Sequence, residues 1–220
     1  MSKTIKTSEL FNVQTSYLKE LFDESEYSYD IIKNIENYIE KIVPTLDGFT
    51  KLKDGVYVGK NVKIHQNAVI EGRAIIGSGS QIRVGAYLRG NVITGENCVI
   101  GNSTELKNCV LLNGVQVPHY NYVGDSILGN FTHLGAGTIC SNLKLDGSNI
   151  VIKIDKEYFS NMRKLGAILG DGANVGAGVI INPGTVLGKN TIVYSGVTLR
   201  GVYDENVIVK TSGEAIKKEW

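Results

Sequence analysis

A six-residue repeat constrains the fold of this chain more than any other feature of its sequence. Aliphatic or similar residues recur at every sixth position, and most are followed four positions later by a small or β-branched residue. The first series comprises Val58, Ile64, Ile70, Ile76, Ile82, Leu88, Thr94, Ile100, Leu106 and Leu112. Neither a helix of period 3.6 nor a two-sided strand of period 2 produces this spacing. The repeat therefore predicts a parallel β-helix, in which each hexad supplies a short strand and a turn and the aliphatic side chain points inward.

The same repeat returns twice further along the chain. Its later members are Leu128 and Leu134, and then Leu169, Val175, Ile181, Leu187, Val193 and Leu199. We predict that the β-helix runs from about Tyr57 to Val209 with two interruptions. The first covers residues 115–125, because Leu112 and Leu128 are not separated by a multiple of six positions. The second covers residues 140–167, whose alternating isoleucines indicate an extruded hairpin or a long loop.

Residues 1–55 lack the repeat and are predicted to be helical. Ser28 is placed to cap a helix whose apolar residues fall on one face, and a shorter helix is expected over residues 16–22. The open end of a β-helix is an exposed sheet edge, so we expect the two helices to cover the first coil; the alternative is a separate binding module. The predicted domains are a helical cap over residues 1–55 and a β-helix over residues 56–220, with an insert at 140–167.

The charges of the chain are nearly balanced, with a formal net charge of +1 over 220 residues. Residues 1–55 hold seven Lys/Arg and ten Asp/Glu, whereas residues 56–220 hold sixteen and twelve. The mildly basic β-helix suits small anions such as phosphates and lacks the basic clusters of a nucleic-acid footprint. Neither a membrane-spanning stretch nor a signal-peptide core is evident, and the three cysteines lack metal-type spacing. We therefore expect a cytoplasmic protein with reduced thiols, no membrane partner and no nucleic-acid partner.

The sequence contains three histidines, His65, His119 and His133. His119 follows Pro118 inside the first predicted interruption. A loop on a rigid solenoid can present a general base to a substrate, and histidine is the side chain most often used for that task. The alternative for this position is a histidine that only hydrogen-bonds within its own loop.

Two short motifs carry a family resemblance. Residues 101–144 contain Pro-His-x-Asn-Tyr-x-Gly-Asp at 118–125 and Gly-Ala-Gly-Thr at 135–138. This segment resembles the acetyltransferase domain of bifunctional glucosamine-1-phosphate N-acetyltransferase/N-acetylglucosamine-1-phosphate uridylyltransferase, and most closely the archaeal-type sugar-1-phosphate acetyltransferases. The resemblance covers roughly residues 56–205. It implies a hexapeptide-repeat acetyltransferase with a left-handed parallel β-helix, whereas the repeat alone does not fix the hand.

The resemblance also implies roles for individual residues. His119 would take the proton from an attacking sugar amine, and the backbone amide of Ala136 would face the developing oxyanion, a role suited to a preorganised N–H. The remaining implied contacts are Arg89 and Lys107 to a sugar phosphate, Tyr122 and Asn142 to the amino sugar, and Ala177 and Ser195 to coenzyme A. His133 replaces an asparagine that lies near the reacting groups in the bifunctional enzymes, so it would tune His119, bind substrate or act as a spacer.

Together these roles imply an acetyl-CoA-dependent N-acetyltransferase that acts on glucosamine-1-phosphate or galactosamine-1-phosphate and requires no metal. The segment before the β-helix, residues 1–55, is too short for a nucleotide-binding domain, so no uridylyltransferase activity is expected. The family further implies a homotrimer in which each site lies between two subunits.

Three alternatives stay open on the sequence. One is a different acceptor, such as a nucleotide-linked amino sugar or another amine. A second is a zinc protein similar to the γ-type carbonic anhydrases, left-handed β-helices that bind zinc with three histidines gathered from two subunits. The spacings between His65, His119 and His133 do not match that family, which places two of its ligands much closer together. The third is a non-catalytic β-helix used for assembly or regulation. Taken singly, Arg89 and Lys107 also fit solvated residues at the edge of the β-helix.

Overall fold

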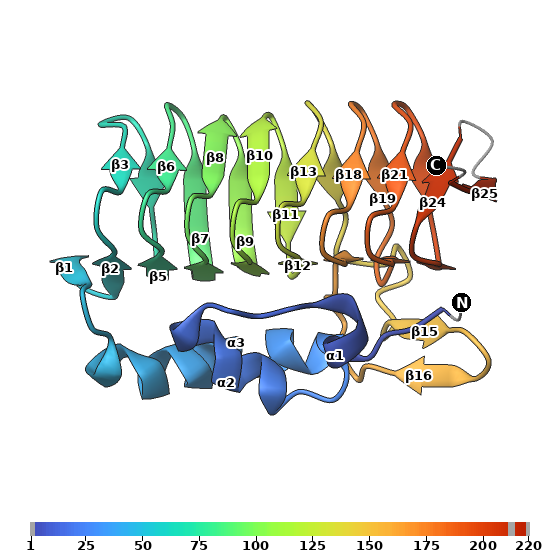
Figure 1. Ribbon diagram of the computed structural model, residues 1–220, viewed down its shortest axis with the longest axis horizontal. Coiled ribbons are helices and arrows are strands. Elements are labelled where there is room, and N and C mark those ends of the chain that lie inside the picture. Colours follow the sequence, from blue (N-terminus) through green and yellow to red (C-terminus); the bar gives the residue numbers. More distant parts are fainter. Residues whose placement is uncertain (1–2, 211–213, 219–220) are drawn as a thin grey trace.

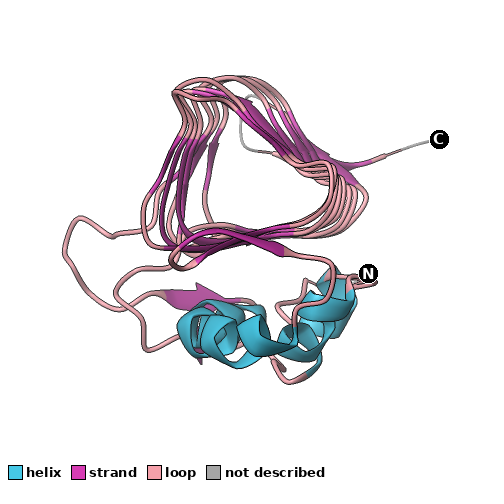
Figure 2. Ribbon diagram, turned by 90° about the vertical axis from the view of Figure 1, so that its left-hand side faces the viewer, coloured by secondary structure: helices cyan, strands magenta, loops and turns pink. Residues whose placement is uncertain are grey.

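The computed structural model describes residues 3–210 and 214–218. Short strands stack along one axis and form a left-handed parallel β-helix. The coils appear as successive rungs in Figure 1 and as a triangular prism in Figure 2. The predicted fold class, mainly β with an N-terminal helical segment and an inserted hairpin, is confirmed.

The prism has three flat sides, which we call the first, second and third faces in chain order within a coil. The first face consists of β3 (Lys63–Ile64), β6 (Gln81–Ile82), β8 (Val99–Asn102), β10 (Gln116–His119), β13 (His133–Leu134), β18 (Asn174–Val175), β21 (Ile192–Val193) and β24 (Val207–Val209). A final strand, β25 (Ala215–Lys217), pairs with β24 in the antiparallel direction.

The second and third faces share two long strands, β7 (Tyr87–Thr94) and β9 (Glu105–Leu111), which bend from one face to the next. The second face consists of β4 (Val69–Ile70), the first halves of β7 and β9, β11 (Tyr122–Gly124), β14 (Ile139–Cys140), β19 (Ile180–Ile181) and β22 (Thr198–Leu199). The third face consists of β2 (Val56–Val58), β5 (Arg73–Ile76), the second halves of β7 and β9, β12 (Ile127–Leu128), β17 (Ile168–Leu169), β20 (Val186–Leu187) and β23 (Val202–Tyr203). Strand β1 (Thr50–Lys53) pairs antiparallel with β2.

The repeat predicts the inward side chains of the solenoid as far as β9, where its phase slips by one residue. The register between β7 and β9 shifts after Arg89, so Thr94 pairs with Leu111 and not with Leu112. Leu111 therefore packs in the solenoid core, whereas Val110 and Leu112 pack in the cluster that contains the helices. The prediction of one phase without a slip up to Leu112, with Val110 inward, is wrong for this reason.

The first predicted interruption is also wrong, because residues 115–125 continue the solenoid without a break. Val99 on β8 pairs with Gln116 on β10 in the parallel ladder of the first face. This coil and the next are each one residue shorter than three hexads, because Thr94 pairs with Leu111 and Leu111 with Leu128. The two losses together place Leu128 two positions out of phase with Leu112. His119 is consequently the last residue of β10, and not part of an extruded loop.

The second interruption contains the predicted hairpin. Strands β15 (Val151–Lys153) and β16 (Glu157–Phe159) pair antiparallel between β14 and β17. Ile150 and Ile152 are only 1% and 2% exposed, because they pack in the same apolar cluster as the helices. The insert therefore lies beside the helices, as Figure 1 shows.

The N-terminal segment forms α1 (Thr7–Leu10), α2 (Ser16–Asp23), α3 (Ser28–Ile42) and a 3₁₀ turn, η1 (Val43–Thr45). The two predicted helices are present, but Ser28 is the first residue of α3 rather than its cap, and its hydroxyl donates to the Ile5 carbonyl. The helices lie along the third face and not over the first coil (Figures 1 and 2). Their position follows from an apolar stripe on the outside of that face, which includes Ile75, Ile93 and Ile127 and is buried beneath α2 and α3.

None of the helices in the described residues is both long enough and apolar enough to span a membrane. Cys98, Cys109 and Cys140 are all buried and carry free thiols. Burial raises the pKa of Cys98 and of Cys140 to about 12, so both thiols stay protonated at neutral pH. Cys98 packs in the solenoid core as a small inward residue.

Candidate functional site

Four of the predicted site residues lie in one column along the edge between the first and second faces. We call this column the His119 corner. Each member ends a first-face strand or follows one closely, and the members are His119, Ala136, Ala177 and Ser195. The His119 carbonyl accepts a hydrogen bond from the amide one residue after Ala136 at 3.0 Å. The carbonyls of Ala136 and Ala177 accept the equivalent bonds from the next coils at 2.8 Å. The β-helix therefore holds the predicted base, oxyanion donor and coenzyme A contacts on one rigid line.

The imidazole of His119 is exposed and has no hydrogen-bond partner among the described residues. Its position is fixed through the backbone, because the His119 amide donates to Asn121 Oδ1 at 3.1 Å. Asn121 is buried, and its own side-chain amide donates to the Gly135 carbonyl at 2.8 Å. The alternative in which the ring only bonds within its loop thus finds no partner in the described part of the chain. The ring is free to contact a ligand.

The backbone amides along this corner differ in what they bind. The Ala177 amide donates to the Ser195 hydroxyl at 3.1 Å. The Ala136 amide has no acceptor among residues 3–210 and 214–218, and Ala136 is exposed. An N–H that is fixed in direction and free of a partner is the kind of donor that stabilises an oxyanion.

A second group of polar residues covers the outside of the second face near its edge with the third. We call it the second-face cluster; its members are Arg89, Glu105, Lys107, Tyr122, Asp125 and Asn142. Arg89 and Lys107 occupy matching positions on β7 and β9. Arg89 Nε lies 2.7 Å from Glu105 Oε1, and Lys107 Nζ lies 2.7 and 2.8 Å from the two oxygens of Asp125. Each cation is therefore paired with a carboxylate.

The two ion pairs differ in burial and in the donors they leave free. The side chains of Lys107 and Asp125 are only 17% and 5% exposed, whereas those of Arg89 and Glu105 are 39% and 32% exposed. Arg89 uses Nε for its pair and keeps its two terminal nitrogens without a partner in the described residues. Lys107 uses two of its three N–H donors on Asp125. Both cations thus retain donors for an anion such as a phosphate.

Tyr122 and Asn142 meet above a glycine. Asn142 Nδ2 lies 3.2 Å from the Tyr122 hydroxyl and also donates to Asp125. A Cβ atom at Gly124 would lie 2.5 Å from that hydroxyl and 2.7 Å from Asn142 Nδ2, closer than real Cβ contacts come. Glycine at this position therefore allows the two side chains to lie together.

The environment of Tyr122 keeps its hydroxyl protonated. Burial, and then the carboxylates of Asp125 and Glu105, raise the pKa of Tyr122 above its ordinary value of 10.0. Because Asn142 donates to the Tyr122 oxygen, the hydroxyl proton is not engaged in that bond. Tyr122 is consequently able to donate a hydrogen bond to an oxygen of a ligand.

His133 does not join the second-face cluster. It lies on β13 of the first face, half-buried, in register with Asn174. Its Nδ1 lies 3.1 Å from Asn174 Oδ1, which fixes the ring against the next coil. His133 is therefore a polar residue on the first-face side of the His119 corner, and its three expected roles stay predictions.

Sequence reasoning missed two members of the second-face cluster, Glu105 and Asp125. Glu105 stands two positions before Lys107, and residues two apart on a strand point to the same side. Asp125 follows Gly124 at the end of the Pro-His motif, but its pairing with Lys107 depends on the coil length. The sequence spacing could therefore have indicated Glu105, whereas only the structure shows that Asp125 belongs to the cluster.

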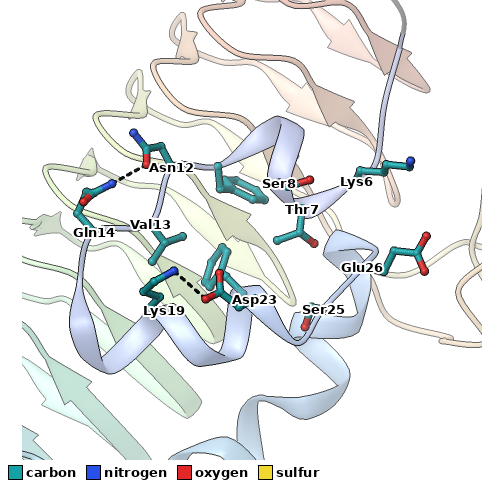
Figure 3. Close-up of a pocket in the computed structure, with 12 residues that line it drawn as sticks. Lys6, Thr7, Ser8, Asn12, Val13, Gln14, Lys19, Asp23, Ser25 and Glu26 are labelled. Carbon is teal, nitrogen blue, oxygen red and sulfur yellow. Dashed lines mark hydrogen bonds and ion pairs between the residues drawn. The ribbon is translucent and has the colours of Figure 1, made fainter.

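Two hollows of about 670 Å³ each lie away from these residues. Figure 3 shows the first, between α1 and α2, where a Lys19–Asp23 ion pair and a Gln14–Asn12 hydrogen bond line the wall. The second lies between the insert and the solenoid. None of the predicted site residues lines either hollow, and His119 and Ala136 are exposed on the surface of the single chain.

The histidines do not gather into a metal site among the described residues of a single chain. Within the part of the chain that the structure describes, no three His, Cys, Asp or Glu side chains gather closely enough to hold a metal ion. The zinc alternative therefore has no ligand set within the described residues of a single copy, and a site shared between two subunits is not tested by this result.

Comparison with known proteins gives one family model and many relatives. The family model described as the GMPPB C-terminal domain matches residues 70–164. The bifunctional protein GlmU of Methanococcus aeolicus is 31% identical over 98% of this chain and 57% of its own length. A bifunctional sugar-1-phosphate nucleotidylyltransferase/acetyltransferase of Sulfurisphaera tokodaii is 36% identical over 63% of this chain and 38% of its own length. The chain thus spans about half the length, or less, of these relatives.

Among solved structures, a variant of AntD, an N-acyltransferase from Bacillus cereus in complex with dTDP and coenzyme A, is 20% identical. The match covers 78% of this chain and 91% of that chain with a TM-score of 0.44, and it has no bearing on function. The family resemblance seen in the motifs at 118–125 and 135–138 is borne out by the relatives. The chain is a hexapeptide-repeat β-helix whose relatives are GlmU-type bifunctional proteins, archaeal ones among them.

Proposed function

We propose that this chain is an acetyl-CoA-dependent N-acetyltransferase whose acceptor is an amino-sugar 1-phosphate, glucosamine-1-phosphate or galactosamine-1-phosphate. The observation that carries the proposal is the exposed ring of His119, which has no partner in the described residues. Tyr122 of the second-face cluster follows it after the corner, as the first residue of β11. The Sulfurisphaera tokodaii relative, a bifunctional sugar-1-phosphate nucleotidylyltransferase/acetyltransferase, supports the substrate class. The proposal concerns acetyl transfer alone.

In the proposed reaction, the acceptor nitrogen attacks the thioester carbonyl carbon, a C–N bond forms and the C–S bond breaks. His119 takes the proton that the amine loses, as a general base must. The Ala136 amide donates to the carbonyl oxygen while it carries negative charge. The proton held by His119 is then available to the leaving thiolate, so atoms and charge balance.

The substrates are proposed to approach along different lines. Coenzyme A would follow the His119 corner past Ala177 and Ser195, which occupy the next coils of the same column. The acceptor would lie on the second face, with Tyr122 and Asn142 on the sugar and the free donors of Arg89 and Lys107 on the phosphate. Charge-assisted bonds from such donors are roughly twice as strong as neutral ones.

We further propose that a second copy of the chain covers this open surface in a homotrimer. Support comes from apolar side chains exposed beside the site: Tyr120 is 64%, Tyr194 47% and Ile180 38% exposed. Exposed apolar residues that gather around a polar site are typical of an interaction surface. Light scattering under assay conditions is expected to report a trimer, and a monomer that turns over substrate would contradict the assembly.

The decisive experiment follows free thiol as the protein consumes acetyl-CoA. The acceptor panel comprises glucosamine, glucosamine-1-phosphate, galactosamine-1-phosphate and a nucleotide-linked amino sugar. We expect one of the two 1-phosphates to give the highest kcat/KM. Faster turnover of the nucleotide-linked sugar would favour the alternative acceptor, and no thiol release with any amine would refute the acetyltransferase.

A further inference from the structure

The carboxylate of Asp125 joins several side chains of the second-face cluster. It accepts hydrogen bonds from Lys107 Nζ at both oxygens, from Asn108 Nδ2 at 3.0 Å, and from Asn142 Nδ2. Asp125 itself is only 4% exposed. It cannot touch a ligand on the face, yet each of its side-chain partners reaches the face or borders it.

The backbone fixes this carboxylate in place. Asp125 has a φ of +46°, in the left-handed region that aspartate and asparagine tolerate better than most residues. Its amide donates to the Lys107 carbonyl and its carbonyl accepts from the Gly166 amide, both at 2.8 Å. The turn between the second and third faces is therefore locked to the coils before and after it.

We infer that Asp125 is a positioning residue for the acceptor, which orients Lys107 toward the phosphate and Asn142 toward the sugar. The inference rests on the proposed function. Two N–H donors of Lys107 are held by Asp125, so the third has a fixed direction. The Asn142 amide is held between Asp125 and the Tyr122 hydroxyl. One buried charge thus sets the geometry of three residues that are proposed to contact the acceptor.

Asp171 is a second carboxylate of the solenoid, and its contacts are those of a purely structural residue. Asp171 accepts from the backbone amides of Asn12 and Asn130 at 2.8 and 2.7 Å, and from Asn130 Nδ2 at 3.0 Å. These bonds tie the N-terminal segment to a turn of the solenoid and involve no predicted site residue. Asp171 is therefore the matched control for Asp125.

The test is Asp125→Asn, which keeps the side-chain shape and the tolerance for positive φ. The new amide group would be a donor facing the donors of Lys107 and Asn142, so at least one of their bonds is lost. We expect KM for the 1-phosphate acceptor to rise on the order of tenfold to a hundredfold, with KM for acetyl-CoA unchanged. The preference for phosphorylated over free amino sugar should shrink. Asp171→Asn is expected to lower the unfolding temperature and to leave both KM values unchanged.

A double-mutant cycle with Lys107→Met separates positioning from a general loss of order. If Asp125 acts through Lys107, the effect of Asp125→Asn on acceptor KM is smaller in the Lys107→Met background. If the effects of Asp125→Asn and Lys107→Met on acceptor KM are fully additive, no part of the Asp125 effect acts through Lys107, and the inference is overturned. Should Asp125→Asn fail to fold, the double variant removes both charges of the buried pair and avoids an unpaired one. Its acceptor KM, compared with that of Lys107→Met alone, then decides: a further rise of tenfold or more would overturn the route through Lys107.

The outcomes also distinguish this inference from the proposed function. Turnover of a 1-phosphate by the unsubstituted protein, with unchanged acceptor KM in Asp125→Asn, refutes the positioning role and leaves the acetyltransferase standing. No turnover of any amine refutes the proposed function, and the positioning role with it.

Discussion

The substitution Gly124→Ala perturbs the second-face cluster by a single methyl group. That Cβ would lie 2.5 Å from the Tyr122 hydroxyl and 2.7 Å from Asn142 Nδ2. To reach an ordinary contact of 3.4 Å, the hydroxyl and the amide must retreat by roughly 0.9 and 0.7 Å. Gly124 does not adopt a positive φ, so alanine adds no left-handed strain. The whole effect therefore falls on the two side chains that are proposed to hold the sugar.

A shift of about 1 Å in a positioning group can cost on the order of a hundredfold in rate. We expect kcat/KM for the acceptor to fall roughly tenfold to a hundredfold in Gly124→Ala, and KM for acetyl-CoA to stay unchanged. Overpacking costs about 1–3 kcal/mol in a tight core, and less where a neighbour is the end of a movable side chain. The protein should therefore remain folded in a thermal melt, and steady-state kinetics with each substrate varied in turn measures the effect.

Gly48→Ala is the control for a change of glycine as such. Gly48 has a φ of +74°, and no atom lies within 4 Å of the place that an added methyl group would take. Alanine there brings backbone strain alone, about 1–2 kcal/mol. We expect a lower melting temperature and unchanged acceptor kinetics. The reasoning is refuted if folded Gly124→Ala keeps its acceptor kcat/KM within twofold, or if Gly48→Ala loses as much.

Three further predictions concern the base, the phosphate and the helical layer. His119→Ala should lower kcat on the order of a hundredfold without a change in melting temperature, since its exposed ring holds nothing in place; near-normal turnover would remove it as the base. Arg89→Ala should reduce the preference for phosphorylated over free amino sugar roughly tenfold or more; an unchanged ratio would make Arg89 a surface residue. Ile93→Ala should lower the free energy of unfolding in urea by about 2–5 kcal/mol, whereas exposed Val69→Ala should change it by less than about 0.5 kcal/mol; equal losses would contradict the packing of the helices on the third face.

The sequence predicts the coils of this fold because the inward positions are chemically uniform, but it does not locate the slip in phase. On the third face the inward residue has an aliphatic neighbour that points outward to the helices. Ile75 and Ile76 form such a pair, and so do Val110 and Leu111. When the inward residue and its outward neighbour are both aliphatic, a coil that is one residue shorter still shows an aliphatic residue at every sixth position. Only strand pairing shows that Leu111 is inside.

The same slip explains which part of the candidate site could be predicted. Residue type and position point to His119, because histidine is the side chain most often used as a general base, whereas Arg89 and Lys107 are indicated only by the family resemblance. Their partners follow from register. Lys107 contacts Asp125, which lies three full hexads later in the sequence. Residues that pair on the third face of the same coil, such as Val110 and Ile127, are separated by one position fewer. The contact between Lys107 and Asp125 comes from the turn at Asp125, whose positive φ no sequence pattern indicates.

The position of the helices limits where the solenoid can meet other molecules. The outside of the third face is buried beneath α2, α3 and the insert. The first and second faces have no such cover among the described residues, and they share one edge, the His119 corner. A ligand or a second copy that packs against both free faces must therefore lie along that corner. If the proposed function holds, the apolar stripe on the third face directs binding to the opposite edge of the prism, where the His119 ring is exposed and the Ala136 amide has no acceptor among the described residues.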